Sequence, residues 1–383
     1  MYNLNDEQNK ILESARVVAD EVIAPNARAT DENGQFPEAA ISALGREGLL
    51  GLTVPTEFGG LGQGVPLAVA VLDEISQCCA STGMVYLMHL CGVACYAARP
   101  EAASEQLRAA ARGEHLSTLA WSEKGSRSHF WAPVSRASRN NGHISLSAEK
   151  SWVTSAGRAD GYVVSSGATG MSGPTESTLY LVLKDDSGFK VAGAWDSLGL
   201  RGNASAPMKL EDVRLQPNRE LSSNGEGFGM MLGVVLPVFQ LGNAAISVGI
   251  CEAAVKSTIE HLTGKRFEHL DSKLADLPNL RARLAQMRIE TDRARAHLAA
   301  SVSAAVGGVP TAMLMVLESK AAAAQSAITV TDLAMQTCGG AAFSKHLSVE
   351  RNFRDARAAN VMAPTSDVLH DFIGKALCGM ELF

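Results

Sequence analysis

Apolar residues recur at helical spacing through the first third of the chain. The clearest run extends from Ile11 to Ile23, and Asn5 followed by Gln8 predicts a cap at its start. Pro25 is expected to end this helix, because proline cannot continue the hydrogen-bond ladder. Further helical patterns cover the ranges 39–49, 66–80, 82–98 and 102–111. The pattern therefore predicts an N-terminal helical unit.

The pattern changes in the middle of the chain from helical periodicity to alternation. Ile144, Leu146 and Ala148 alternate with polar residues, as in a strand that has one buried face. Further β-rich runs lie at 162–165 and 178–183, and helical periodicity returns at 242–262, 280–306, 313–338 and in the closing segment to Leu377. We therefore predict an α+β protein with an N-terminal α-helical domain over residues 1–118, a central β domain over 119–225 and a C-terminal helical domain over 226–383.

Composition narrows the classes of partner. The chain has 383 residues, 46% of them hydrophobic, which is enough for a large core. Its net charge of −6 and its lack of basic runs predict no binding to nucleic acid or to an anionic membrane surface. The polar, amphipathic start, and apolar segments judged too short to span a bilayer, predict a cytoplasmic protein.

The seven cysteines are odd in number and scattered. The adjacent pair Cys78 and Cys79, and the spacing of Cys91 and Cys95, could serve a metal, but no His/Cys set at zinc-site spacing accompanies them. We therefore expect small core residues in a reducing compartment and no metal site.

Residues of the β section suit a flat aromatic cofactor. Trp121, Trp131 and Trp152 lie there among hydroxyl-rich strand ends and clustered glycines, although each tryptophan taken alone is more simply explained by core packing. The chain has no G-x-G-x-x-G after a strand and no phosphate-binding loop. Any cofactor site must therefore use another scaffold.

Motifs along nearly the whole chain resemble, in the same order, those of the acyl-CoA dehydrogenase family. Val54 to Gly62 is similar to that family's V-P-E-E-Y-G-G-L-G loop, and Lys150 to Gly157 resembles its G-K-x-W-I-T-N-A. Further matches are Trp121-Ser122-Glu123 to T-E-P, Gln336 to Phe343 to Q-x-x-G-G-x-G-Y, and Glu350 to Asp355 to E-R-x-x-R-D. The resemblance implies an N-terminal α domain, a central β-barrel-like domain and a C-terminal four-helix bundle, assembled as a homotetramer.

The same resemblance implies an FAD site between the β domain and the bundle, part of it supplied by a neighbouring subunit. At matched positions the isoalloxazine would be lined by Ser122, Trp152, Val153, Thr154, Ser155 and Thr365. The adenine and pyrophosphate end would be approached by Gln336, Gly339, Gly340 and, from a neighbour, Arg266.

The family's catalytic base is missing from both places where relatives carry it. Removal of the α proton of an acyl thioester needs a carboxylate within hydrogen-bond reach. Before Thr365, the position of the family's Glu holds Ala363. Other relatives place the base on the first bundle helix, immediately before an Arg, and here Phe239 and Gln240 occupy those two positions.

In lacking the Glu, the chain resembles the flavin monooxygenases and oxidases that share this fold. In them reduced flavin reacts with O₂ to a C4a-peroxide, and the protein donates hydrogen bonds and excludes water. The residues expected to do so are His89, Ser128, His129 and His370, although each histidine taken alone is more often structural.

We therefore expect a flavin-dependent oxygenase or oxidase acting on a small aromatic or cyclic acid or its CoA thioester, with O₂ as co-substrate. If a separate flavin reductase supplies the electrons, FMN is the alternative to FAD. Two other functions stay open. An acyl-CoA dehydrogenase with a relocated base would use Glu123 or Asp367, and a flavin-binding homologue with a structural or regulatory role would have lost catalysis.

Overall fold

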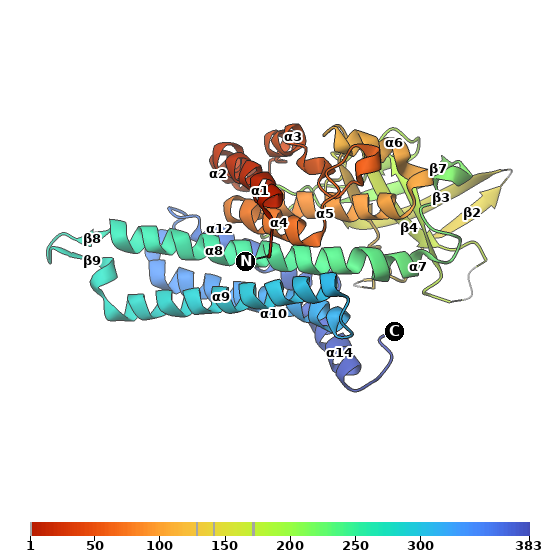
Figure 1. The fold of residues 1–383 in the computed structure, drawn as a ribbon. Helices are drawn as coiled ribbons and strands as arrows, with labels where there is room; N and C mark the ends of the chain where they lie inside the picture. Colours follow the sequence, from red (N-terminus) through yellow and green to blue (C-terminus); the bar gives the residue numbers. More distant parts are fainter. Residues whose placement is uncertain (1, 128, 141, 171–172) are drawn as a thin grey trace.

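The N-terminal part of the chain is a layer of helices that covers one side of the C-terminal helices (Figure 1). The structure is a computed structural model that describes residues 2–127, 129–140, 142–170 and 173–383. The predicted cap is confirmed, because the Asn5 side chain accepts a hydrogen bond from the Gln8 backbone while the Gln8 side chain returns one to Asn5. The helices of this layer are α1 (Asp6–Val18), α2 (Ala24–Glu32), α3 (Glu38–Arg46), α4 (Val65–Cys78), α5 (Ala80–Ala98) and α6 (Pro100–Ala111).

Pro25 does not end the first helix, contrary to the sequence-based expectation. After α1 the chain winds as a π-helix over Ala19–Ile23 and continues directly into α2. Pro25 lies in the first turn of α2, where a missing backbone N–H costs little. Because the π-helical segment ends just before it, the proline lies at the start of a helix and not in a helix interior, where it would interrupt the backbone hydrogen bonds.

The middle of the chain forms a curled sheet, seven-stranded within the described residues (Figure 1). Its order is β1-β4-β2-β3-β7-β6, with β5 also paired to β4. The predicted strands at 144–148, 162–165 and 178–183 are confirmed and extended. The strands are β1 (Ser117–Ala120), β2 (Arg136–Asn140), β3 (His143–Val153), β4 (Gly161–Gly167), β5 (Ser177–Leu183), β6 (Phe189–Val191) and β7 (Ala206–Leu215).

The C-terminal part is built on long antiparallel helices that pack along their lengths (Figure 1). A small hairpin of β8 and β9 extends beyond them at the end far from the sheet. The elements are α7 (Gly227–Met230), a π-helical segment (Met231–Val235), α8 (Leu236–Gly264), β8 (Arg266–Phe267), β9 (Ser272–Lys273), α9 (Pro278–Gly307), α10 (Ala312–Cys338), α11 (Gly340–Phe343), α12 (Val349–Asp355), α13 (Ala358–Val361) and α14 (Ser366–Leu377).

Two helical runs of the described chain are long and apolar enough to cross a membrane, so the expectation that none would be was wrong. They are Ala80–Ala98 and Gly227–Gly264, and 83% and 78% of their most apolar windows are buried inside the protein. Their apolar character follows from packing on several sides, because α5 contacts α4, α6, α8 and β1, and α8 contacts α4, α5, α9 and α10.

Two neighbouring side chains of α12 connect the helical layer, the sheet and the bundle. Arg354 donates to both carboxylate oxygens of Asp31 on α2, at 2.8 and 2.5 Å, and to Glu350 one turn earlier. Asp355 accepts from the Leu200 backbone N–H at 2.6 Å, in the loop between β6 and β7. The ion pairs are largely buried, with 14% of the Arg354 side chain and 10% of the Asp31 side chain exposed. The three parts of the chain are therefore joined by buried charge as well as by apolar packing.

Arg354→Met is expected to lower the free energy of unfolding by about 3–5 kcal/mol, because it leaves two buried carboxylates without their cation. The control is Arg293→Met, whose side chain is 73% exposed and paired with Glu290, and which should cost less than about 1 kcal/mol. Urea unfolding of both variants measures the difference. Equal losses in the two variants would show that the α12 pair does not hold the parts together.

Candidate functional site

A strained turn at the end of β3 forms the first wall of the candidate site. Trp152 and Ser155 have φ values of +56° and +60°, in the left-handed region that residues other than glycine rarely adopt. The Trp152 indole is 66% exposed and meets the Trp195 ring edge-on, with centroids 5.8 Å apart. Val153 and Thr154 beside it are buried. The turn therefore presents a large flat side chain at the surface instead of hiding it in the core.

Only some of the polar groups behind this turn have hydrogen-bond partners. The Thr154 hydroxyl lies 3.0 Å from the Ser205 hydroxyl, and the Thr154 carbonyl accepts from the Thr118 hydroxyl at 2.8 Å. Within the described residues, Ser155 Oγ and Trp121 Nε1 are buried without a hydrogen-bond partner. Buried donors are normally paired, so these groups suit a polar heteroaromatic ring laid against the turn. Ser122, half-buried nearby, connects to β3 by accepting a bond from the Ser151 N–H.

Glu123, one of the two carboxylates considered as a relocated base, is fully engaged. It accepts from Lys150 Nζ at 2.6 Å and from the backbone N–H groups of Val134 and Ser135 at 2.7 and 2.8 Å. Burial opposes its ionisation, but Lys150 and the Ser135 hydroxyl outweigh burial and lower the pKa of the carboxyl. Glu123 therefore acts as a structural group whose ionised form is favoured by its hydrogen-bond partners.

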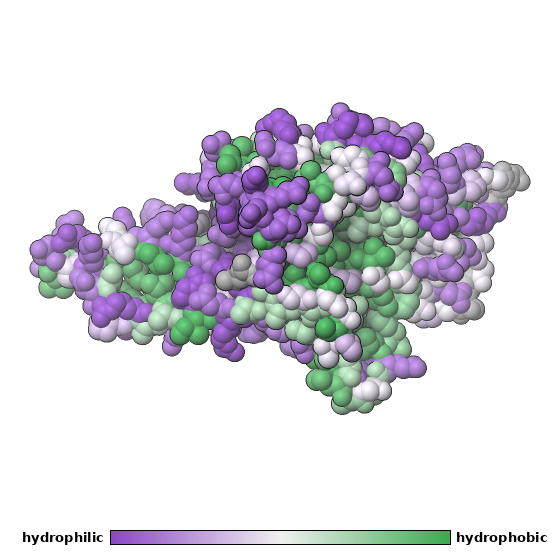
Figure 2. All heavy atoms as spheres, viewed as in Figure 1, coloured by the Kyte–Doolittle hydropathy of each residue, from purple (hydrophilic) through white to green (hydrophobic). Residues whose placement is uncertain are grey.

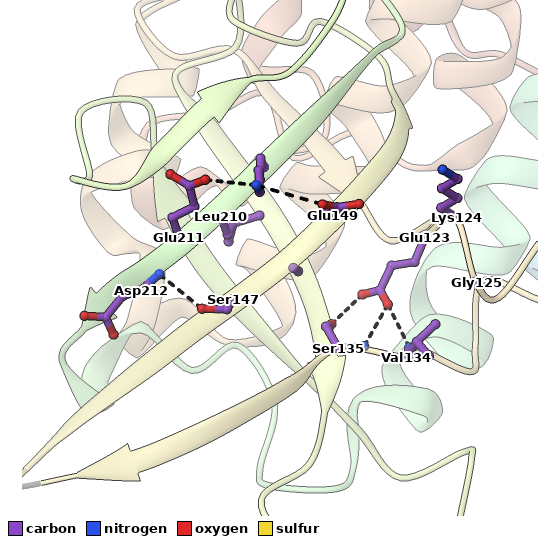
Figure 3. A pocket seen from close by; sticks show the side chains of 12 residues that line it. Glu123, Lys124, Gly125, Val134, Ser135, Ser147, Glu149, Leu210, Glu211 and Asp212 are labelled. Atoms are coloured by element: carbon purple, nitrogen blue, oxygen red, sulfur yellow. Dashed lines mark hydrogen bonds and ion pairs between the residues drawn. The ribbon is translucent and has the colours of Figure 1, made fainter.

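Glu123 also borders a hollow on the sheet, over β3 and β7 (Figure 3). The other charged side chains there are Lys124, Glu149, Lys209, Glu211 and Asp212, of which Lys209 is half-buried and the other four are exposed. Lys209 pairs with Glu211 at 3.0 Å, so the charges of the hollow largely satisfy one another. None of the residues expected to bind flavin lines this hollow.

His89 lies in the core between α5, β1 and the turn at Leu50. Its Nδ1 accepts from the Ser117 N–H at 3.1 Å, so Nε2 carries the proton and donates to the Leu50 carbonyl at 2.7 Å. Burial lowers the pKa of His89 to about 4, which keeps the ring neutral at pH 7. Both nitrogens are thus used to hold elements together, which is the geometry of a structural histidine.

Of the remaining polar candidates, His129 lies near the helix that carries His370. Ser128 falls outside the described residues. His129 is exposed and stacks on Trp131 with centroids 4.8 Å apart. Trp131 in turn lies 5.8 Å from Phe372 on α14, the helix that also carries the exposed His370. The structure therefore brings His129 and α14 together around Trp131.

Lys320 of α10 anchors the loop that carries Ala363. Its Nζ donates to the carbonyls of Met362 and Pro364 at 2.9 and 2.6 Å, on either side of Ala363. The same nitrogen lies 5.9 Å from the centre of the Phe239 ring. The two positions at which a base was expected, Ala363 and Phe239, therefore border one buried amine. Sequence reasoning missed Lys320, because its partners lie more than forty residues away in the chain.

The Lys320 amine has an unusual electrostatic environment. Its side chain is fully buried, and desolvation lowers its pKa to about 7. Within the described residues no carboxylate bonds to it, and Asp367, the second carboxylate considered as a base, is exposed at the start of α14. Thr365 caps α14 by accepting a hydrogen bond from the Val368 N–H at 3.4 Å. The site thus holds a buried amine where the sequence comparison led us to look for an acid.

Residues expected at the adenine end lie far from this loop within one chain. Gln336 follows Lys320 by sixteen residues of α10, so at about 1.5 Å per residue they lie about 24 Å apart along the helix. Gly339 and Gly340 are exposed at the end of α10, and Gly339 has φ +55° and ψ −131°, a conformation open to glycine. Arg266 pairs with Asp271 in the distant β8–β9 hairpin (Figure 1). One chain therefore does not bring the two groups together.

Three family models match consecutive parts of the chain. The acyl-CoA dehydrogenase N-terminal domain matches residues 5–114, the acyl-CoA dehydrogenase middle domain matches 118–213 and the acyl-CoA dehydrogenase C-terminal domain matches 225–378. Together they cover the helical layer, the sheet and the bundle in the same order.

Similar proteins extend over nearly the full length of the chain. It is 28% identical to the 3-sulfinopropanoyl-CoA desulfinase of Paraburkholderia xenovorans, covering 100% of this chain and 98% of that protein. It is 26% identical to the probable acyl-CoA dehydrogenase FadE25 of Mycobacterium tuberculosis, covering 98% and 97%. The structure of butyryl-CoA dehydrogenase from Megasphaera elsdenii superposes with a TM-score of 0.90 at 23% identity, covering 98% and 99%.

Lys320→Met is expected to change the pH dependence of stability, because it removes a group that titrates differently in the folded and unfolded states. The Lys320 pKa is about 7 when folded and about 10.4 in an unfolded chain, so the unfolded state binds more protons between these values. The stability of the wild type relative to Lys320→Met should therefore rise by roughly 3–5 kcal/mol from pH 7 to pH 10.

Unfolding by urea at several pH values measures this slope, and Lys256→Met on the exposed surface of α8 is the matched control. The control should show the same pH dependence as the wild type. A constant difference between Lys320→Met and the wild type across this range would mean that the two carbonyls hold the amine protonated throughout.

Proposed function

Because this chain belongs to the acyl-CoA dehydrogenase family, we propose that it is an FAD-dependent enzyme that acts on an acyl group carried as a CoA thioester. The observation that carries the proposal is the ordered match of all three domains, from residue 5 to residue 378. The relatives whose names state a substrate act on CoA thioesters. The turn at Trp152 supports a flavin partner, since it combines an exposed indole with a strained backbone of the kind found at ligand sites.

The donor set around this turn fits FAD. Trp152 would cover the ring, while Thr154, Ser155 and the indole N–H of Trp121 would supply hydrogen bonds to its heteroatoms. Thr365, fixed at the cap of α14, would approach the ring from the bundle. The bound flavin supplies an acceptor for a hydride. The chain's own contribution is to orient the ring and to keep water from it.

We propose that a second copy of the chain completes the flavin site, within a homotetramer. Gln336 lies about 24 Å along α10 from Lys320, which holds the Ala363 loop, and Gly339 and Gly340 follow beyond Gln336. Within one chain these residues therefore face a different part of the surface. Figure 2 shows apolar surface over the region of α14, where Leu377 and Met380 are 68% and 60% exposed. Exposed apolar surface of this kind suits contact with another copy.

An oxygen-using reaction, which the sequence led us to expect, has weaker support. His89, expected to face the oxygen adduct, spends both ring nitrogens on the Ser117 N–H and the Leu50 carbonyl. The relatives reported above are named for dehydrogenation or desulfination, not for oxygenation. Action on a CoA thioester therefore explains more of the observations than hydroxylation of a free aromatic acid.

A second candidate reaction on the same substrate class removes a substituent from the acyl chain instead of two hydrogens. It is favoured by the lack of a carboxylate at Ala363 and Phe239, together with the engagement of Glu123 and the exposure of Asp367. Dehydrogenation requires a base at the α-carbon. A sulfinate that leaves as SO₂ instead leaves its bonding electrons on the carbon, which then takes up a proton, so no α-proton has to be removed. The desulfinase relative belongs to this reaction type by its name.

Anaerobic titration of the FAD-loaded protein with butyryl-CoA distinguishes these reactions. Binding of the thioester should perturb the flavin spectrum, and any bleaching should be slow because no base is in place. Ala363→Glu restores a carboxylate and should accelerate bleaching by about 10²–10⁴-fold, the usual contribution of a positioned base. Ala363→Gln is the matched control and should not accelerate it.

Asp367→Asn tests the relocated base, and we expect it to leave bleaching unchanged because the side chain is exposed. Fast bleaching by the wild type that disappears in Asp367→Asn would restore the ordinary dehydrogenase mechanism. A flavin spectrum that no CoA thioester perturbs, together with O₂-dependent conversion of an aromatic acid, would contradict the proposal.

A further inference from the structure

A buried carboxamide stands on the bundle helix beside the Ala363 loop without hydrogen-bond partners. Gln240 of α8 is 0% exposed, and neither its Oε1 nor its Nε2 finds a partner in the described residues. Leaving buried polar atoms unpaired destabilises the fold, and native proteins leave few of them. The Gln240 amide is therefore expected to be paired by something that binds to the chain.

Asn243 extends this polar surface toward the loop. It lies three residues after Gln240, on the same side of α8, and is 2% exposed. Its Nδ2 donates a weak hydrogen bond to the Met362 sulfur at 3.5 Å, while its Oδ1 has no partner in the described residues. The contact with Met362 places the two amides beside the segment that carries Ala363.

The surroundings of the Gln240 and Asn243 amides favour a bound group that accepts hydrogen bonds over an apolar one. Phe239, next to Gln240, has its ring centre 5.9 Å from the buried Lys320 amine. That amine bonds to two backbone carbonyls and to no carboxylate in the described residues. An alkyl chain placed here would leave the carboxamide of Gln240 unpaired, whereas an oxygen atom would accept from its N–H groups. A negatively charged oxygen would in addition balance the charge of the buried Lys320 ammonium group, which has no carboxylate partner in the described residues.

We propose that Gln240, assisted by Asn243, binds an oxygen-bearing group on the acyl chain of the substrate. The substrate class is an acyl-CoA whose chain carries a carboxylate, sulfinate or hydroxyl group near the reacting carbons. This inference rests on the proposed function and makes Gln240 a residue that determines specificity. A site built to hydrogen-bond a substrate discriminates strongly against the analogue that lacks the group, because its own buried atoms then lose their partner.

The test compares three probes on the FAD-loaded protein: butyryl-CoA, 3-hydroxybutyryl-CoA and succinyl-CoA. Dissociation constants come from the perturbation of the flavin spectrum and from calorimetry. The wild type should bind at least one of the two oxygen-bearing thioesters at least about tenfold more tightly than butyryl-CoA. The hydroxyl and carboxylate probes separate a neutral from an anionic substituent, and succinyl-CoA should be the tighter of the two.

Gln240→Met keeps the shape of the side chain and removes both polar atoms. It should abolish the preference while leaving the affinity for butyryl-CoA within about twofold, and its melting temperature should equal or exceed that of the wild type, because two unpaired buried atoms are gone. Gln325→Met, the same change on the exposed side of α10, is the matched control and should retain the preference.

The outcomes separate this inference from the function on which it rests. Equal affinities for all three thioesters in the wild type, or a preference that survives Gln240→Met, would overturn the specificity role and leave thioester binding intact. A lowered melting temperature with an unchanged preference would show that the amide serves only the fold, through bound water. Failure of every thioester to bind would instead remove the proposed function.

Discussion

The buried ion pairs of α12 are the constraint on which the rest of the arrangement depends. Arg354 forms an ion pair with Asp31 of the helical layer, and the neighbouring Asp355 accepts a hydrogen bond from the Leu200 backbone N–H in the sheet domain. Adjacent residues thus fix two separate parts of the chain against the bundle. Because α12 leads through α13 into the loop around Ala363, the position of that loop relative to the sheet follows from these contacts. The proposed flavin site lies between the sheet and the bundle, which these contacts hold together.

Much of the fold could be predicted from periodicity and from local signals. The cap at Asn5, the alternation in β3 and the long bundle helices all depend on residues close in sequence. The prediction failed at Pro25, because a π-helical turn shifts the helical phase and no local rule announces such a turn. It failed also in judging that no apolar segment was long enough to span a bilayer, because α5 and α8 are apolar on several sides at once where they pack in the core.

For the candidate site, motif order predicted positions but not chemistry. It pointed to Trp152, Thr365 and Ala363, whereas hydrogen-bond partners distant in sequence decide what each group can do. His89 is occupied by residues thirty-nine positions before it and twenty-eight after it. Lys320 became visible only once α10 and the Ala363 loop were placed side by side. Whether a buried titratable group has a partner depends on the folded structure, and the sequence predicts it only when the two groups are close along the chain.

The distance along α10 between the two groups of cofactor residues has a consequence for how the protein behaves on dilution. If the ring end and the adenine end of one flavin are held by different copies, a lone chain carries two half-sites and no whole one. The affinity for the cofactor then depends on assembly: binding of flavin favours association of the chains, and association of the chains favours binding of flavin. Holoenzyme would form steeply above a threshold concentration of chains, so a cell could switch this activity through expression level alone.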